Sequence, residues 1–165
     1  MSIIPASHSD LFDLPAVWHV ATIGPSGEPH VSPVWADFDG THIRFPHLEG
    51  RQKWRNLRAD DRIALSATDP DSNERYLEVR GRVVGIEHAG AMELLDAQSQ
   101  KYRGDDFPRE DAQPLDKRIS VGVEPLHGTT MGGRALGFYC GGSAANSQRL
   151  GQHHPVLAPP KVHCL

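Results

Sequence analysis

The feature that most constrains the fold is a series of short apolar runs that alternate with polar residues and end at turn-like sequences. Residues 16–24 (AVWHVATIG) are followed by GPSGEP and then by residues 30–38 (HVSPVWADF), which is the arrangement of a β-hairpin. Successive side chains of a strand point to opposite faces, so a period-2 apolar pattern is typical of a strand with one buried face. The beginning of the chain therefore predicts two antiparallel strands.

The same pattern recurs along most of the chain. Pro33 lacks an N–H donor, which favours an edge position or a bulge for the second strand. Helical spacing of apolar residues occurs in residues 50–60 and again in residues 89–102. Further strands are expected, after a turn at Asp39-Gly40, over residues 41–45, 62–69, 75–87 and 117–126. Since the order lacks βαβ alternation, we predict a mainly β (α+β) fold, a six-stranded antiparallel barrel with two or three short peripheral helices and an irregular C-terminal tail.

The C-terminal part of the chain differs in chemistry from the rest. The last acidic residue is Glu124, and residues 127–165 are rich in glycine, alanine and serine, with neither strand nor helix periodicity. Such a composition cannot easily offset the entropy lost on ordering. We therefore predict one domain over residues 1–126 and a low-complexity, disordered tail over residues 127–165.

Several classes of protein are disfavoured by composition. The chain carries a formal net charge of -4, which would repel nucleic acid at long range. No apolar run approaches the roughly 20 residues of a membrane helix, and the N-terminus does not look like a signal peptide. The chain has two cysteines, Cys140 and Cys164, so we expect no disulfide framework and a reducing cytoplasm. The ten histidines lack metal-ligand spacing, and we predict no metal site.

One stretch, residues 50–62 (GRQKWRNLRADDR), concentrates positive charge at the start of an expected helix. A helix dipole favours anions at the N-terminus, whereas Arg51, Lys53 and Arg55 would lie in the first turns here. The positive charges at this helix end become favourable if a phosphate or carboxylate binds there. We interpret the stretch as an anion site, with a merely solvated basic helix as the alternative, and we expect Trp54 to be a core residue.

These motifs, in this order, resemble a known family. The segments ATIGPSGEPHVSPVWADFDG, GRQKWRNLRADDRIALSATDPD and RYLEVRGRV lie within residues 10–126. They are similar to the pyridoxamine 5′-phosphate oxidase-like split-barrel superfamily, and most of all to its branch of deazaflavin-dependent oxidoreductases that use coenzyme F-420. The resemblance implies a split β-barrel that forms a homodimer, with the cofactor at the dimer interface.

The resemblance also implies where the cofactor lies. Its flattened ring is expected against the second strand and its phosphate-bearing tail at the basic helix. The implied cofactor-binding residues are His30, Ser32, Pro33, Val34, Trp35, Pro46, His47, Arg51, Lys53 and Asn56. Where the family often has a Ser or Thr near the phosphate, this chain has Pro46 and His47. His47 could replace the lost donor, although an ordinary surface histidine is the simpler interpretation, and Asn56 is expected to have a structural role as much as a ligand role.

The function implied is an oxidoreductase that transfers a hydride between reduced F-420 and a small organic acceptor of the unsaturated or conjugated carbonyl type. The cofactor would carry the difficult chemistry. We identify no proton donor in the sequence, so the catalytic residues stay unassigned. Two alternatives stay open: an FMN-dependent enzyme like pyridoxamine 5′-phosphate oxidase, and a non-catalytic protein that binds flavin, deazaflavin or haem. The C-terminal Arg/His element of the former enzymes has only a weak counterpart here, in SQRLGQHH.

Overall fold

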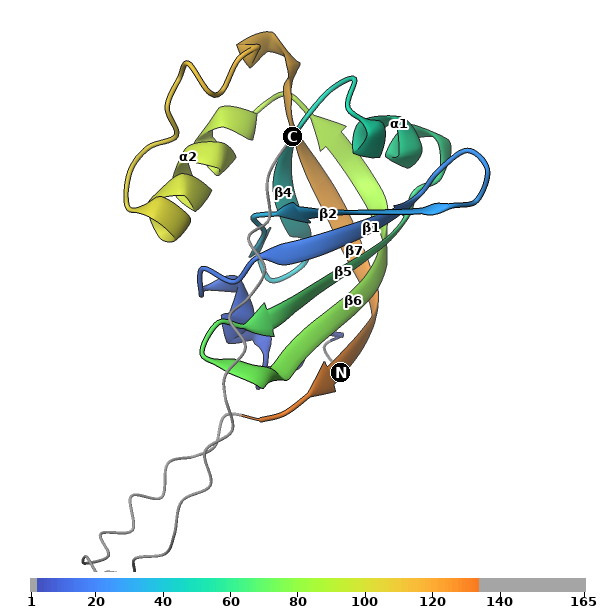
Figure 1. The fold of residues 1–165 in the computed structure, drawn as a ribbon, viewed down its shortest axis with the longest axis vertical. Coiled ribbons are helices and arrows are strands. Elements are labelled where there is room, and N and C mark those ends of the chain that lie inside the picture. The colour runs from blue at the N-terminus through green and yellow to red at the C-terminus, as the bar shows by residue number, and fades with distance from the viewer. Residues whose placement is uncertain (1–2, 134–165) are drawn as a thin grey trace, which may run out of the picture. The chain divides into compact units, whose positions relative to one another are not determined.

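The computed structural model describes residues 3–133 (Figure 1). Within them lie a seven-stranded antiparallel sheet, two α-helices and two short 3-10 helices. The strands are β1 (Trp18–Ile23), β2 (Pro29–Val34), β3 (Asp37–Phe38), β4 (Ile43–Leu48), β5 (Arg62–Asp69), β6 (Ser72–Glu87) and β7 (Arg118–Met131). The helices are α1 (Gln52–Ala59), α2 (Ala91–Arg103), η1 (Ser9–Phe12) and η2 (Leu115–Lys117). The mainly β, antiparallel prediction is confirmed, but the strand count differs from the six expected.

The additional strand arises because the second predicted strand is divided. Residues 30–38 contribute to both β2 and β3, which lie at opposite edges of the sheet order β2-β1-β5-β6-β7-β4-β3. The break falls at Trp35 and Ala36. The Lys101 ammonium group binds the carbonyl oxygen of Ala36 at 3.0 Å, so this carbonyl is engaged by α2. The predicted hairpins are present, since β1 pairs with β2 and β3 pairs with β4 across the Asp39-Gly40 turn.

This connection brings the two edges of the sheet together. Only Trp35 and Ala36 separate the end of β2 from the start of β3. Three consecutive Cα–Cα steps of about 3.8 Å span at most roughly 11 Å, so the sheet must curl until its edges nearly meet. Within the described residues no ladder joins β2 to β3. The curled sheet with this unpaired gap is consistent with the expected split barrel.

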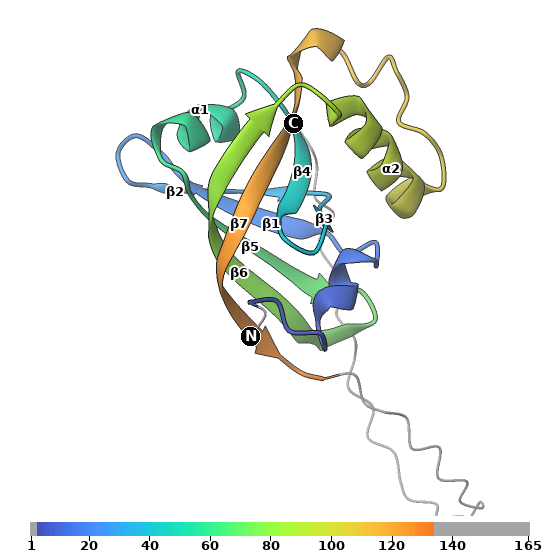
Figure 2. The ribbon, with the colours of Figure 1, turned by 180° about the vertical axis from the view of Figure 1, so that it is seen from behind.

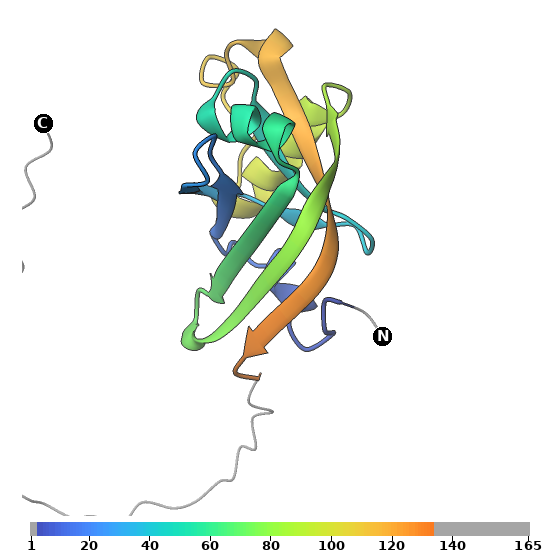
Figure 3. The same ribbon diagram turned by 90° about the vertical axis from the view of Figure 1, so that its right-hand side faces the viewer.

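The core fills the inside of the curl. Alternate residues of the strands are buried, as the period-2 pattern predicts for β5 and β6, which run beside β7 in Figure 3. The largest fully buried side chains include Trp18, Phe45 and Leu65, which come from three different strands. Phe12 of η1 stacks on Trp18, with ring centroids 4.2 Å apart, and covers part of this core.

Both α-helices lie at the end of the sheet where β4 ends and β7 begins (Figures 1 and 2). The predicted helices correspond to α1 and α2, and within residues 3–133 neither is long and apolar enough to cross a membrane. The last strand is longer than expected, because β7 continues to Met131, which pairs with Tyr76 of β6. Residues 127–131, which we assigned to the tail, therefore belong to the sheet. The predicted tail from residue 134 onward lies outside the described residues.

Candidate functional site

Two adjoining cavities lie beside β2, β4 and the start of α1, and together we call them the cleft. Their volumes are about 640 Å³ and about 450 Å³. The residues that line both cavities are Ser32, Pro46, His47, Lys53 and Arg118. Every cofactor-binding residue implied by the sequence, except Asn56, lines at least one of the two. The fold thus gathers side chains from two strands and a helix into one place.

Local structure explains how α1 reaches the cleft. Gly50 has a φ of 77°, a left-handed conformation that suits glycine at the turn from β4 into the helix. Arg51 is the N-cap residue, without a capping hydrogen bond from its side chain, and the first turn contains no acidic residue. The helix therefore begins at Gln52, two residues after the start of the basic stretch, and the Arg51 side chain does not cap its amide donors. This arrangement favours an anion near the N-terminus of α1.

Only part of the basic stretch faces the cleft. Arg51 and Lys53 line it, whereas the Arg55 guanidinium donates to Gln52 Oε1 at 2.9 Å and to the carbonyl oxygen of Gly50. Trp54 packs against the core, as expected, with the guanidinium of Arg58 5.1 Å from its ring centroid. The sequence pattern alone could not distinguish the cations that line the cleft from those that form hydrogen bonds within the helix.

Lys53 is the most unusual cation of the cleft. Its side chain is almost completely buried, at 3% exposure, and within the described residues it forms no ion pair with a carboxylate. The ammonium nitrogen lies 5.4 Å from the centroid of the Phe45 ring. Burial lowers the pKa of Lys53 from its ordinary value of 10.5 to about 8. A buried ammonium group without a counter-ion is costly, and an anionic ligand would supply what it lacks.

Arg118 adds a third cation that the sequence did not reveal. It is the first residue of β7 and pairs in register with Leu48 of β4, which places it beside His47. Its guanidinium donates to the backbone carbonyl oxygens of Ala112 at 2.6 Å and Asp111 at 2.9 Å. Burial and the charge of Arg51 lower its pKa. No local pattern marks Arg118, because only the β4–β7 register brings it to the cleft.

His47 is not an ordinary surface residue, which corrects the simpler interpretation of its sequence position. It lines both cavities, and burial followed by the charges of Lys53 and Arg51 lowers its pKa from 6.5 to about 4. The ring is therefore neutral near pH 7.

Three polar atoms of the cleft lack hydrogen-bond partners within the described residues. These buried atoms are His47 Nε2, His30 Nδ1 and Ser32 Oγ. Buried polar groups in folded proteins are nearly always paired, so a polar ligand or water is expected to complete these three. No carboxylate lines either cavity, while three cationic side chains do. The cleft therefore fits a ligand with an anionic group and several hydrogen-bonding atoms, as a flavin-type cofactor with a phosphate has.

Asn56 is the predicted site residue that the structure does not bring into the cleft. Its amide nitrogen donates to Thr22 Oγ1 at 3.0 Å, and its amide oxygen accepts from Gln52 Nε2 at 2.7 Å. The side chain is buried, and its hydrogen bond to Thr22 connects α1 to β1. Its position agrees with the structural role that the sequence suggested.

The far end of the larger cavity is apolar and aromatic. We call it the aromatic end, and it is formed by Val17, Trp35, Leu95 and Phe107. Only Trp35 was expected there. Leu95 belongs to α2 and Phe107 to the segment that follows it, and no sequence signal links either position to β2. Tertiary packing of α2 against the sheet places them in the cleft.

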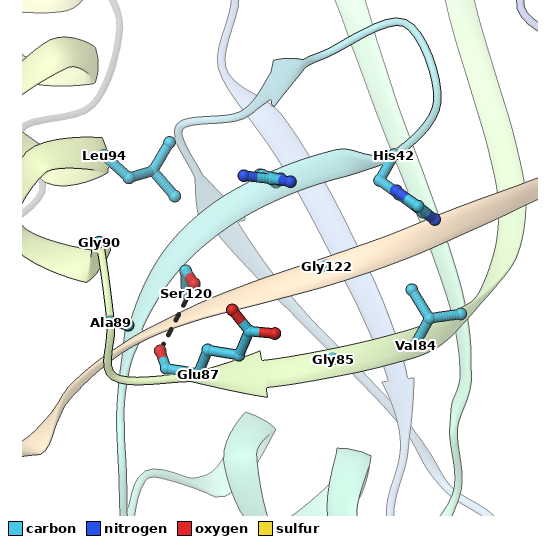
Figure 4. Close-up of a pocket in the computed structure, with 10 residues that line it drawn as sticks. His42, Val84, Gly85, Glu87, Ala89, Gly90, Leu94, Ser120 and Gly122 are labelled. Atoms are coloured by element: carbon cyan, nitrogen blue, oxygen red, sulfur yellow. Dashed lines mark hydrogen bonds between the residues drawn. The ribbon is translucent and has the colours of Figure 1, made fainter.

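Another cavity, of about 380 Å³, lies between β4, β6, β7 and the start of α2 (Figure 4). Its lining carries both signs of charge, with Glu87 facing the same space as Arg44, whose guanidinium already pairs with Asp39 at 3.0 Å. The Ser120 hydroxyl donates to the carbonyl oxygen of Glu87 at 3.4 Å, as Figure 4 shows. A mixed lining suits a phosphate-bearing ligand less well than the carboxylate-free cleft does. Among residues 3–133, no group of His, Cys, Asp and Glu side chains is arranged to hold a metal ion.

Comparison with known families decides what kind of fold this is. The sequence profile described as pyridoxamine 5′-phosphate oxidase matches residues 4–131. The chain belongs to the pyridoxamine 5′-phosphate oxidase family. The match ends where β7 ends, so it includes every described strand and helix of this family member. Proteins of this family bind flavin-type cofactors, in agreement with the chemistry of the cleft.

Solved structures share this fold. An F-420 reductase is 32% identical, with a TM-score of 0.70, and the match covers 76% of this chain and 98% of that protein. A conserved hypothetical protein from Mycobacterium tuberculosis is 24% identical, with a TM-score of 0.65 and coverage of 88% and 94%. HupZ from Group A Streptococcus is 17% identical, with a TM-score of 0.57 and coverage of 81% and 99%, and shows the fold alone. Comparison with curated proteins gives no match.

Proposed function

We propose that this protein is an oxidoreductase that transfers a hydride between reduced coenzyme F-420 and a small organic acceptor of the unsaturated or conjugated carbonyl type. The observation that carries the proposal is the cleft, where buried Lys53 meets Arg51 and Arg118 without any carboxylate in the lining. The similarity to an F-420 reductase, at 32% identity over nearly the whole of that protein, supports F-420 as the cofactor.

Each part of the cleft has a distinct role in this proposal. Arg51, Lys53 and Arg118 hold the phosphate through charge-assisted contacts. His30, Ser32 and His47 supply hydrogen-bonding atoms that otherwise lack partners. Reduced F-420, when bound, supplies the hydride. The proton donor stays unassigned, and solvent is the proposed source of the accompanying proton.

Other residues orient the reactants and keep water away. Val34 and Trp35 at the end of β2 form an apolar surface for the cofactor ring, and Pro33 beside them adds a rigid backbone. Pro46 of β4 lines both cavities and contributes an apolar surface between the phosphate end and the ring. Exclusion of water from such a surface strengthens electrostatic interactions inside the cleft.

FMN is the alternative cofactor, because it also carries a phosphate that the three cations could hold. Parallel fluorescence titrations of the purified protein with F-420 and with FMN separate the two. We expect saturable, tighter binding of F-420. Saturable binding of FMN without binding of F-420 would contradict the proposal. Oxidation of reduced F-420 that depends on an added acceptor separates an enzyme from a non-catalytic binding protein.

We also propose that the protein is a homodimer with the cofactor at the dimer interface, and that the second copy covers the outer face of β1, β5 and β6 as well. An apolar groove of about 370 Å³ lies on this face, lined by residues such as Ala21, Ala64 and Leu126. Beside it, Val31 is 58% exposed. Arg62, Arg80 and Arg82 also line the groove, and each pairs with a carboxylate (Asp60, Glu78 and Asp61, respectively), a mixture of charges that a second copy of the same face can match.

Sedimentation analysis tests this interface. Ala64 lies in the groove, opposite Ala21 of β1 and Arg80 of β6. The substitution Ala64→Glu should shift the dimer toward monomer, because its larger side chain would occupy the groove that the second copy covers. Val84→Glu, at an exposed position outside the groove, is the matched control. An Ala64→Glu protein that keeps the wild-type dimer constant would exclude this face as the interface.

A further inference from the structure

We infer that Lys53 is a covalent capture site for small aldehydes that carry a phosphate group, which enter the cleft when no cofactor is bound. The aldehyde carbon forms an imine with the side-chain nitrogen of Lys53, while Arg51 and Arg118 hold the phosphate. This reaction goes beyond the proposed hydride transfer and does not depend on it. Because it uses the same cations as the proposed cofactor site, bound aldehyde and bound cofactor exclude each other.

The position of Lys53 combines burial with access to a ligand space. It is the second residue of α1 and lines both cavities, although the residue is only 3% exposed. Its nitrogen lies 5.4 Å from the centroid of the Phe45 ring, which offers an apolar surface. Within residues 3–133 no carboxylate forms an ion pair with this nitrogen. No salt bridge therefore has to be broken before the amine reacts.

The charge state of Lys53 also favours reaction. Only the neutral amine is nucleophilic, and desolvated lysines are the ones that form imines with carbonyl compounds. Burial lowers the pKa of Lys53 from 10.5 to about 8. At pH 7 about one Lys53 side chain in ten is then neutral, compared with about one in 3,000 for a lysine of pKa 10.5.

The neighbouring guanidinium groups select the class of aldehyde. Arg51 and Arg118 line the smaller cavity together with Lys53, and no carboxylate does. The Arg118 guanidinium is held in place by the carbonyl oxygens of Ala112 and Asp111. Guanidinium groups stay charged at neutral pH and bind phosphate through charge-assisted hydrogen bonds. A phosphorylated aldehyde is thus concentrated beside Lys53, whereas an uncharged aldehyde of the same length lacks this attraction.

Formation of the imine requires no oxidant or reductant. The lone pair of the neutral Lys53 nitrogen forms a bond to the aldehyde carbon, and the π pair of the carbonyl group moves to its oxygen, which gains the proton that the nitrogen loses. The resulting carbinolamine releases its hydroxyl group and the second nitrogen proton as water, which leaves a carbon–nitrogen double bond. His47 lines the same cavities, and its buried Nε2, which lacks a partner within residues 3–133, supplies a hydrogen-bonding atom for the carbinolamine hydroxyl group.

Glyceraldehyde 3-phosphate and glyceraldehyde test the inference, because they share the same aldehyde group and differ in the phosphate. Each is added at pH 7 to the full chain, without added cofactor, in the presence of sodium cyanoborohydride. This reagent delivers a hydride to the imine carbon and leaves a stable secondary amine. Peptide mass spectrometry then measures the rate of labelling at each amine. Lys117 is exposed and lines neither cavity, so it is the internal comparison.

We expect glyceraldehyde 3-phosphate to label Lys53 at least about ten-fold faster than it labels Lys117. It should also label Lys53 about ten-fold faster than glyceraldehyde does, and Arg118→Ala should remove most of this preference while glyceraldehyde still labels Lys53. Lys117→Met is the matched control and should keep the wild-type labelling of Lys53. Labelling of Lys53 no faster than that of Lys117, or equal labelling by the two aldehydes, would overturn the inference.

Addition of F-420 separates this inference from the proposed function. F-420 bound in the cleft should slow the labelling of Lys53 in proportion to its occupancy and leave Lys117 unaffected. Fast labelling of Lys53 that saturating F-420 does not slow would support the capture site and contradict the proposed cofactor site. Saturable binding of F-420 by a protein whose Lys53 reacts no faster than Lys117 would refute the capture site alone.

Discussion

Replacement of Lys53 by Met tests whether the protein tolerates an unfavourable buried charge in order to bind its cofactor. Methionine keeps a flexible apolar stem of similar length and a comparable helix propensity, but removes the ammonium group. Since burial lowers the pKa of Lys53 from 10.5 to about 8, the charged form destabilises the folded state by about 3 kcal/mol at pH 7. Lys53→Met should therefore raise the free energy of unfolding by up to about 3 kcal/mol at pH 7.

The pH dependence follows from the sign of the shift. The folded-state pKa lies below the unfolded value, so the penalty is fully present below about pH 8 and is relieved as the pH rises toward 10.5. The stability advantage of Lys53→Met over wild type should thus shrink between pH 7 and about pH 10. Urea unfolding followed by tryptophan fluorescence at both pH values measures it.

The same substitution should weaken the binding of F-420. Loss of one charge-assisted contact costs about 1.5–3 kcal/mol, or about ten-fold to a hundred-fold in Kd. Arg55→Met, in the same helix but with its guanidinium directed to Gln52 and Gly50, is the matched control and should change stability by less than about 0.5 kcal/mol. If Lys53→Met is less stable than wild type at pH 7, or binds F-420 equally well, the reasoning about Lys53 is wrong.

Three further predictions concern neighbouring residues. Because burial lowers the pKa of His47 to about 4, stability linked to its neutral ring should be lost only as the pH falls from about 6.5 through 4. Its imidazole NMR signals should still be those of the neutral ring at about pH 5.5, and a titration midpoint of these signals near pH 6.5 would contradict the prediction. Asn56→Ala should lower the free energy of unfolding by about 1–3 kcal/mol in chemical denaturation, because it leaves Thr22 without this hydrogen-bond partner. The affinity for F-420 should change little, and a loss of affinity at unchanged stability would instead make Asn56 a cofactor ligand. Arg118→Ala should weaken F-420 binding by about ten-fold in fluorescence titration, most strongly at low ionic strength, and an unchanged Kd would remove Arg118 from the phosphate site.

The local pattern of the sequence was sufficient to predict most of the strands and both helices. Alternation of Ile63, Leu65 and Ala67 marks the buried face of β5, because the side-chain period of a strand is set by its own backbone. The Asp39-Gly40 turn is likewise a property of neighbouring residues. The local pattern does not mark the break between β2 and β3 at Trp35 and Ala36, where the Ala36 carbonyl oxygen accepts a hydrogen bond from Lys101, a residue distant in sequence.

The same distinction applies to the cleft. By itself, the sequence determined that cations cluster at the start of α1 and that β2 carries His30 and Ser32, since these are features of contiguous segments. Only the tertiary structure decided that Arg118 and Phe107 join them. Their positions depend on the register of β4 against β7 and on the packing of α2. Contacts between residues far apart in the chain produce no periodic pattern in the sequence of either segment.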